Sequence, residues 1–121
     1  MIYDDAVKLM KEYQNKGYLI IIITNQSGIN RGYFSDSEFY AFNDAVIKAL
    51  AERGVTVNAT YYCPHRPDER CECRKPKPGL VLRAVEELGI DLADSIIAGD
   101  RQDRDGDLAR NLGIPFIHFK R

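Results

Sequence analysis

Three cysteines and one histidine gather in a single stretch of this 121-residue chain. Cys63, His65, Cys71 and Cys73 include every cysteine of the sequence and one of its two histidines. Three thiolates and an imidazole form the ligand set of a closed tetrahedral zinc site, which leaves no position open for substrate. The pattern therefore predicts a structural zinc that orders a loop. Free buried or redox-active thiols are the alternative, because a Cys71–Cys73 disulfide would be strained and would leave one cysteine over.

A stiff cationic loop follows the cluster. Residues 74–79 read Arg-Lys-Pro-Lys-Pro-Gly, in which the two prolines restrict the backbone and remove two hydrogen-bond donors. A rigid loop that presents Lys75 or Lys77 suits neutralisation of a negative charge, and a merely solvated cationic loop is the other interpretation. The ligand spacing differs from the paired Cys-x2-Cys of zinc ribbons, so we do not expect a finger that binds nucleic acid.

Two further polar groups follow apolar segments. Residues 24–28 read Thr-Asn-Gln-Ser-Gly after the apolar run 18–23. Such a turn can cradle a phosphoryl group, although an ordinary polar turn also fits. Asp100 follows the apolar segment 95–98 and Gly99, and its carboxylate is of the type that binds a hard cation such as Mg2+. Further acidic residues lie just beyond it, as additional ligands or as helix caps: Asp103, Asp105 and Asp107.

The elements that must position these groups alternate between helix and strand. Ser35 with Glu38 is a capping-box signature for a helix that ends at Gly54. Alternation at this spacing indicates βα units around a mostly parallel sheet, an α/β fold in which ligands bind beyond the carboxyl ends of the strands. The predicted helices are 5–16, 35–54, 78–89 and 105–112, and the predicted strands are 18–23, 55–62, 95–98 and 114–119.

Length, charge and hydropathy set the outer limits. We expect a single domain over residues 1–121, with the zinc loop at 63–78. A net charge of −1, from 17 basic and 18 acidic residues, predicts no nucleic-acid or membrane partner. No apolar run approaches the roughly 18 residues that span a bilayer, and the first residues do not read as a signal peptide. Thiols kept as metal ligands favour a cytoplasmic location.

Together these groups resemble motifs II, III and IV of the haloacid dehalogenase superfamily. The likeness is closest to the D-glycero-D-manno-heptose 1,7-bisphosphate phosphatases and the related histidinol phosphatases. It rests on Thr-Asn-Gln-Ser-Gly-Ile at 24–29, Arg31-Gly32, Cys-Pro-His at 63–65 and Cys-x-Cys-Arg-Lys-Pro-x-Pro-Gly at 71–79, and it covers essentially the whole chain. The resemblance implies a three-layer fold, a small phosphorylated substrate such as a sugar bisphosphate, and Mg2+-dependent phosphatase chemistry.

The resemblance also implies roles for individual residues. Thr24 and Asn25 would hold the transferring phosphoryl group, Lys75 would offset its charge, and Asp100 would bind Mg2+. The family's second acidic position falls on Arg104, so its neighbour on either side is expected to support the magnesium site, namely Asp103 or Asp105. The implied substrate-binding residues are Asn25, Gln26, Ser27, Arg31 and Arg74.

The chain departs from the superfamily at the nucleophile. The reaction needs an Asp-x-Asp pair at the end of an opening strand, and this sequence has none there. Asp4 and Asp5 are adjacent and introduce a helix, so capping is their expected role. Hydrolysis by this chain alone is therefore doubtful, and a non-catalytic, zinc-stabilised phosphate-binding or regulatory module is the alternative function.

The missing strand would lie in the centre of the sheet. In this fold it runs between the strands at 19–23 and 95–98, so each of these is left with an unpaired edge. Three outcomes follow: the two strands close on each other, a segment from another chain or a homodimer partner fills the gap, or the chain is a fragment of a longer gene product.

Overall fold

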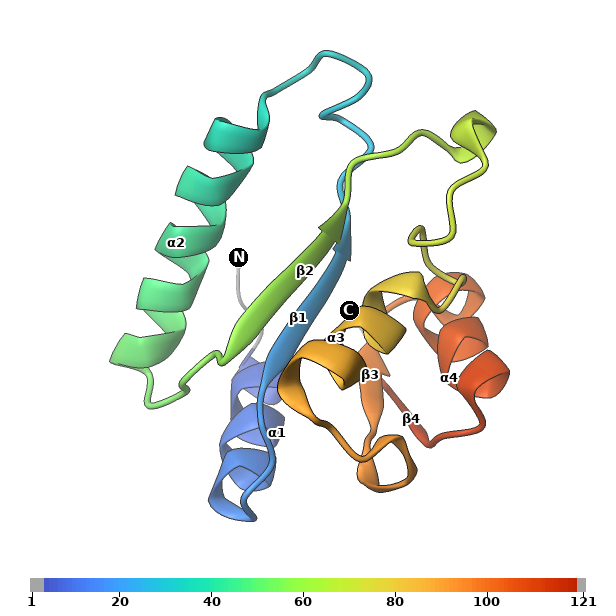
Figure 1. Ribbon diagram of the computed structural model, residues 1–121. Coiled ribbons are helices and arrows are strands. Elements are labelled where there is room, and N and C mark those ends of the chain that lie inside the picture. Colours follow the sequence, from blue (N-terminus) through green and yellow to red (C-terminus); the bar gives the residue numbers. More distant parts are fainter. Residues whose placement is uncertain (1–3, 120–121) are drawn as a thin grey trace.

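The computed structural model describes residues 4–119, and helices alternate with strands along the chain (Figure 1). Every helix and strand predicted above is present, with ends shifted by a few residues. The helices are α1 (Asp4–Asn15), α2 (Asp36–Glu52), α3 (Gly79–Leu88) and α4 (Asp107–Leu112), and the strands are β1 (Ile21–Asn25), β2 (Ala59–Cys63), β3 (Ile97–Gly99) and β4 (Phe116–His118). Three short turns complete them: the 3-10 helices Pro67–Glu69 and Leu92–Asp94 and the π-helix Gln102–Gly106.

The predicted helix signals act as expected. The Ser35 hydroxyl accepts a hydrogen bond from the backbone N–H of Glu38, and the Glu38 carboxylate accepts one from the backbone N–H of Ser35, which completes a capping box before α2. Gly89 ends α3 in the left-handed region at φ 65°. Asp4 and Asp5 form the first turn of α1, where negative charge favours the positive end of the helix dipole.

The strands form two separate parallel pairs. β1 pairs with β2, from Ile21 opposite Ala59 to Asn25 opposite Cys63. β3 pairs with β4 over three positions, and within residues 4–119 no strand joins the two pairs. The outcome in which the strands at 19–23 and 95–98 close on each other is therefore wrong. We call the space between β1 and β3 the strand gap.

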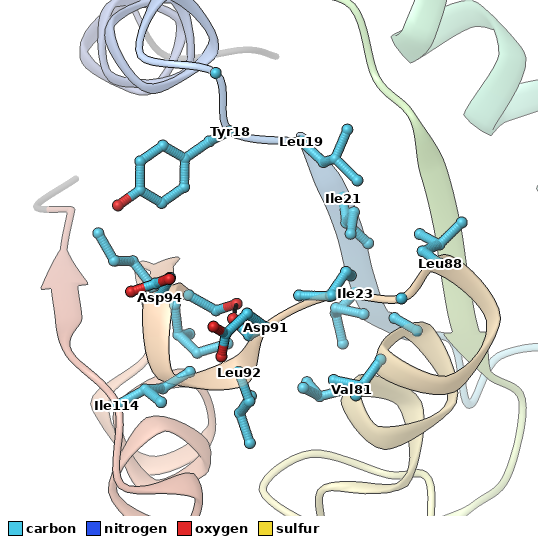
Figure 2. A pocket seen from close by; sticks show the side chains of 18 of the residues that line it. Tyr18, Leu19, Ile21, Ile23, Val81, Leu88, Asp91, Leu92, Asp94 and Ile114 are labelled. Carbon is cyan, nitrogen blue, oxygen red and sulfur yellow. Dashed lines mark hydrogen bonds between the residues drawn. The ribbon is translucent and has the colours of Figure 1, made fainter.

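Two cavities lie in the strand gap, one of about 480 Å³ and one of about 300 Å³. Residues of α3 line the larger cavity and residues of α1 line the smaller one, and both cavities have mainly apolar walls. Figure 2 shows side chains converging on the larger cavity. The apolar run 18–23 has the pattern of a strand buried on both faces, but all five residues of β1 are only half-buried. Both cavities share Tyr18, Leu19, Ile21, Ile23 and Ile96.

The core beside β2 fixes the position of the zinc loop. Tyr61 and Cys63 of β2 pack with Leu80 and Ala84 of α3, and the partly buried Cys71 and Cys73 pack against this cluster. Burying such side chains contributes roughly 1.5–3 kcal/mol for each large apolar residue. None of the helices within residues 4–119 is long and apolar enough to cross a membrane.

Candidate functional site

The Cys/His cluster predicted from the sequence comes together in space. One donor atom from each of Cys63, His65, Cys71 and Cys73 lies within 4.8 Å of all the others. His65 Nδ1 lies 3.3 Å from Cys63 Sγ and 3.1 Å from Cys73 Sγ. Zinc binds thiolates at about 2.3 Å and imidazole at about 2.0 Å in a tetrahedron, so four donors this close together fit a zinc ion. The cluster begins at the last residue of β2, which anchors it to the sheet.

The three thiols differ in acidity. Burial raises the pKa of Cys63 and of Cys73. Burial also opposes ionisation of Cys71, but hydrogen bonds from the Arg74 backbone N–H and the Cys63 thiol outweigh it and lower the Cys71 pKa to about 7. Because the thiolate is the ligand form, Cys71 is the thiol most readily prepared for a metal near neutral pH.

The loop that carries the cluster is tied to the loop after β1. Asn30 Nδ2 donates to both carboxylate oxygens of Glu69, at 3.2 and 3.1 Å. The Glu69 carboxylate also accepts from the backbone N–H of Arg66 at 2.5 Å, and these bonds lower the Glu69 pKa. The two loops that follow β1 and β2 are thus joined at their tips, a link that no local sequence signal indicated.

Lys75 lies where β1 and the segment after β3 meet. Its Nζ donates to Asp105 Oδ1 at 2.6 Å, and the two side chains are only 15% and 9% exposed. Its backbone N–H donates to Asn25 Oδ1 at 2.9 Å, and its carbonyl accepts from Asn25 Nδ2 at 3.3 Å. Residues from two other, distant parts of the sequence therefore converge on Lys75.

In the acidic segment after β3, Asp103 and Asp105, which the sequence could not distinguish as support for the magnesium site, lie in different surroundings. Asp105 is buried, and its Oδ2 accepts from the backbone N–H of Arg101 at 3.3 Å. Asp103 is exposed and pairs with the Arg101 guanidinium at 3.0 Å, which lowers the Asp103 pKa. The π-helix Gln102–Gly106 sets these opposite directions. Asp100, just before it, is half-buried, and its carbonyl accepts from His118 Nε2 at 3.2 Å.

A close contact explains the glycine before Asp100. A Cβ atom at Gly99 would lie 2.1 Å from Asp105 Oδ2, nearer than any real side chain approaches. Only glycine lets the Asp105 carboxylate fold back over the end of β3. In the Gly99-Asp100 pair, the glycine is therefore required for packing, and the aspartate supplies the candidate metal-binding carboxylate.

The turn 24–28 begins inside β1, because Thr24 and Asn25 are the last two residues of that strand. The Thr24 hydroxyl accepts from Gln26 Nε2 at 2.9 Å, and the Gln26 backbone N–H donates to the Cys63 carbonyl at 2.7 Å. Ser27 Oγ accepts from Arg31 Nε at 3.3 Å. These contacts place Gln26, Ser27 and Arg31 in one hydrogen-bonded turn beside the end of the strand.

Arg74 carries an unpaired group within the described part of the chain. Its Nη1 atom is buried and has no hydrogen-bond partner among residues 4–119. A buried guanidinium nitrogen without a partner costs roughly 1–3 kcal/mol or more, so an acceptor from a bound molecule would relieve it. Arg31, the other arginine predicted to bind substrate, is exposed.

The chain is similar to proteins of one phosphatase class. Residues 1–119 match the family described as polynucleotide kinase 3 phosphatase. A solved structure from Mesorhizobium loti, a putative HAD-like phosphatase, superposes with a TM-score of 0.87 at 31% identity and covers 94% of this chain and 57% of that one. The α/β architecture with its parallel strands is therefore the haloacid dehalogenase-like phosphatase fold.

Closer relatives narrow the class. A probable D-glycero-D-manno-heptose-1,7-bisphosphate 7-phosphatase of Thermoplasma acidophilum is 60% identical over 115 residues, which cover 95% of this chain and 72% of that protein. The D,D-heptose 1,7-bisphosphate phosphatase of B. bronchiseptica, solved with magnesium and phosphate, superposes with a TM-score of 0.84 at 32% identity over 96% of this chain and 64% of that one. The chain belongs to the D-glycero-D-manno-heptose-1,7-bisphosphate 7-phosphatase family. It spans between 56% and 79% of the length of the curated relatives compared.

Proposed function

We propose that this chain supplies the phosphate-binding and metal-binding groups of a phosphoric monoester hydrolase that acts with Mg2+ on a small sugar bisphosphate. The observation that carries the proposal is the largely buried pair of Lys75 Nζ and Asp105 Oδ1, 2.6 Å apart, beside the end of β1. A fixed cation at the carboxyl ends of parallel strands is prepared to receive an anion. The names of the relatives support a sugar bisphosphate as the substrate class. The magnesium and phosphate bound in the B. bronchiseptica structure support Mg2+ and a phosphoryl group as the proposed ligands.

Three side chains would act on the phosphoryl group. The Thr24 hydroxyl, together with backbone N–H groups of the turn that follows it, would donate to phosphoryl oxygens. Lys75 would offset the negative charge that develops on them. The Asp100 carboxylate would hold Mg2+, whose chemistry when bound is to neutralise phosphate charge. Of the two acidic neighbours, Asp105 suits the supporting role, because it is buried against Gly99 and Lys75 whereas Asp103 points to solvent.

Arginine side chains would bind the rest of the substrate. Arg74 precedes Lys75 in the sequence, and its buried Nη1 atom, which has no partner among residues 4–119, is suited to donate to a second anionic group. Arg31, held by Ser27 on the loop after β1, would contribute from the opposite loop. A bisphosphate offers two separate anions, which matches a lysine site with arginines around it.

The zinc cluster would have no part in the chemical step. Zinc held by Cys63, His65, Cys71 and Cys73 would be fully coordinated by the protein, so it would only order the loop that ends at Lys75. The cysteine nearest to Lys75 in sequence is two residues away, so the loop order would be transmitted directly to the lysine.

The attacking aspartate is proposed to come from a strand that occupies the strand gap. Asp4 and Asp5 lie in a helix, and Asp4 pairs with Arg53 at 2.5 Å, so neither is placed to attack phosphorus. A strand between β1 and β3 would satisfy both unpaired edges, would bury apolar side chains in both cavities, and would end beside Asn25 and Asp100. A parallel direction matches both neighbours.

A complementation assay tests this function. The purified chain is mixed with a synthetic peptide of five apolar residues that ends in Asp-x-Asp, and phosphate release from heptose 1,7-bisphosphate is followed with Mg2+. We expect release from the mixture and none when the first aspartate of the peptide is asparagine or when the chain carries Asp100→Ala. The chain alone is expected to bind inorganic phosphate with Mg2+ without turnover. Failure to bind phosphate in either form would overturn the proposal.

A second function has one specific observation in its favour. Lys75, Asn25 and Asp105 come together and the Cys/His cluster forms, although residues 4–119 offer no strand-end Asp-x-Asp. A non-catalytic, zinc-stabilised phosphate-binding or regulatory module would keep those features. Phosphate binding that persists while the peptide binds but restores no turnover would favour the module. Size measurement at several concentrations separates filling of the gap by peptide from filling by a second copy.

A further inference from the structure

We propose that Asn25 is a positioning residue that holds the backbone of Lys75, in place of the direct phosphoryl contact that the family resemblance implied. The inference rests on the proposed role of Lys75 in phosphate binding. It concerns how the lysine is kept in place, and it starts from a pair of hydrogen bonds across 50 residues of sequence.

The contact is reciprocal. Asn25 Oδ1 accepts from the Lys75 backbone N–H at 2.9 Å, while Asn25 Nδ2 donates to the Lys75 carbonyl at 3.3 Å. The side-chain amide thus serves both backbone groups of one residue, as a neighbouring strand would. Among side chains of this length only asparagine offers a donor and an acceptor together, because aspartate lacks the donor when ionised and serine is too short.

The backbone of Asn25 is held by the pairing of β1 with β2. Asn25 is the last residue of β1 and lies opposite Cys63 in the parallel register. The next residue, Gln26, donates its backbone N–H to the Cys63 carbonyl at 2.7 Å, which continues the ladder. The amide therefore projects from a fixed strand end, and it transmits the position of β1 to the loop after the zinc cluster.

Lys75 is consequently held at three points. Cys73 of the Cys/His cluster lies two residues before it, Asn25 holds its backbone, and Asp105 holds its ammonium group. The first two restraints fix the main chain and the third fixes the tip. An amide engaged on both ends by the backbone is poorly placed to be released for a phosphoryl oxygen, whereas the Thr24 hydroxyl is bonded to the nearby side-chain amide of Gln26.

Hydrogen exchange in the ligand-free chain tests the contact directly. In 15N-labelled protein, Asn25→Ala is expected to speed exchange of the Lys75 amide about tenfold, as loss of one hydrogen bond predicts. The matched control is Asn43→Ala, which removes an asparagine of α2 that donates to Thr60 Oγ1 of β2 at 3.2 Å, and it is expected to leave exchange of the Lys75 amide unchanged. If Asn25→Ala does not fold, Asn25→Ser serves in its place. Unchanged protection of Lys75 would overturn the inference.

A double-mutant cycle then separates positioning from direct contact. Affinity for inorganic phosphate with Mg2+ is measured for Asn25→Ala, Lys75→Ala and the double variant. We expect about a tenfold loss for Asn25→Ala alone and no added loss in the Lys75→Ala background, since the asparagine acts through the lysine. Losses that multiply would show an independent phosphate contact and would overturn the positioning role. Should the wild-type chain bind no phosphate, the proposed function fails while the exchange result still decides the contact.

Discussion

The two strand pairs divide the candidate site between them. The β1–β2 pair is held over five positions, packs on α3 and carries the Cys/His cluster. The β3–β4 pair is held over three positions, and β3 is followed by Asp100 and then by the π-helix that carries Asp105. Since no strand within residues 4–119 connects the pairs, side chains must join them: Lys75 reaches Asp105, and Asn111 Nδ2 donates to the Pro76 carbonyl at 3.3 Å. The candidate site therefore depends on a few side-chain contacts between the β1–β2 part and the β3–β4 part of the molecule.

Loss of the zinc ligands would act on the β1–β2 pair with the largest effect. Structural zinc contributes about 10 kcal/mol or more in small peptides, so Cys71→Ser is expected to remove stoichiometric zinc and at least about 4 kcal/mol of unfolding free energy. Metal analysis and thermal unfolding measure both. Glu72→Gln, an exposed change between two ligands, is the control and should alter neither. Zinc-free wild-type protein of normal stability would contradict the metal site.

Asp105→Asn would act on the contact between the pairs. It removes the counter-charge of a lysine whose side chain is only 15% exposed, and breaking a buried ion pair costs about 3 kcal/mol. Urea unfolding measures the loss. Asp107→Asn is the matched control, because its partner Arg110 is 76% exposed and such surface pairs contribute less than about 1 kcal/mol. Equal effects of the two substitutions would show that the Lys75 pair has no special weight.

Gly99→Ala would act at the end of β3, where the Asp105 carboxylate packs. The added methyl meets the Asp105 carboxylate at 2.1 Å and must displace it, at a cost of about 2 kcal/mol. Unfolding of the single variant and of Gly99→Ala combined with Asp105→Gly measures the clash. We expect the combined loss to be smaller than the sum of the separate losses, since removing the carboxylate makes room. Additive losses would mean that the two residues do not collide.

Ser35→Ala gives the smallest effect, on helix α2, which packs beside β2. Loss of the capping box is expected to cost about 1 kcal/mol of unfolding free energy and to leave phosphate affinity unchanged. Chemical unfolding and phosphate titration are the measurements. Ser37→Ala, exposed in the first turn of the same helix, is the comparison and should cost less. A change in phosphate binding would show that α2 is coupled to the site.

Local signals predicted most of the elements and the metal cluster. The capping box at Ser35, the stop at Gly89 and the cysteine spacing each depend on a few neighbouring residues, and each is found in the structure. The apolar run 18–23 predicted a strand, yet β1 extends to Asn25, because pairing with β2 continues as far as Cys63. Strand ends depend on the partner strand, which local pattern does not contain.

The parts of the candidate site that could not be predicted from the sequence depend on long-range contacts. The choice between Asp103 and Asp105 depends on the π-helix, and the partner of Asn25 lies 50 residues away. The resemblance placed Asn25 on the phosphoryl group by position alone, so it carried no information about the direction of the side chain. The glycine before Asp100 was the one available signal of close packing there.

The strand gap has a consequence for how cells would handle the chain. Its walls include Leu19, Leu88 and Tyr18, apolar residues that remain 50%, 38% and 37% exposed. Hydrophobic dyes, chaperones and proteases recognise such surface as a sign of incomplete folding. Without an occupant the chain would therefore be short-lived, and the amount of protein that survives would report how often the gap is filled.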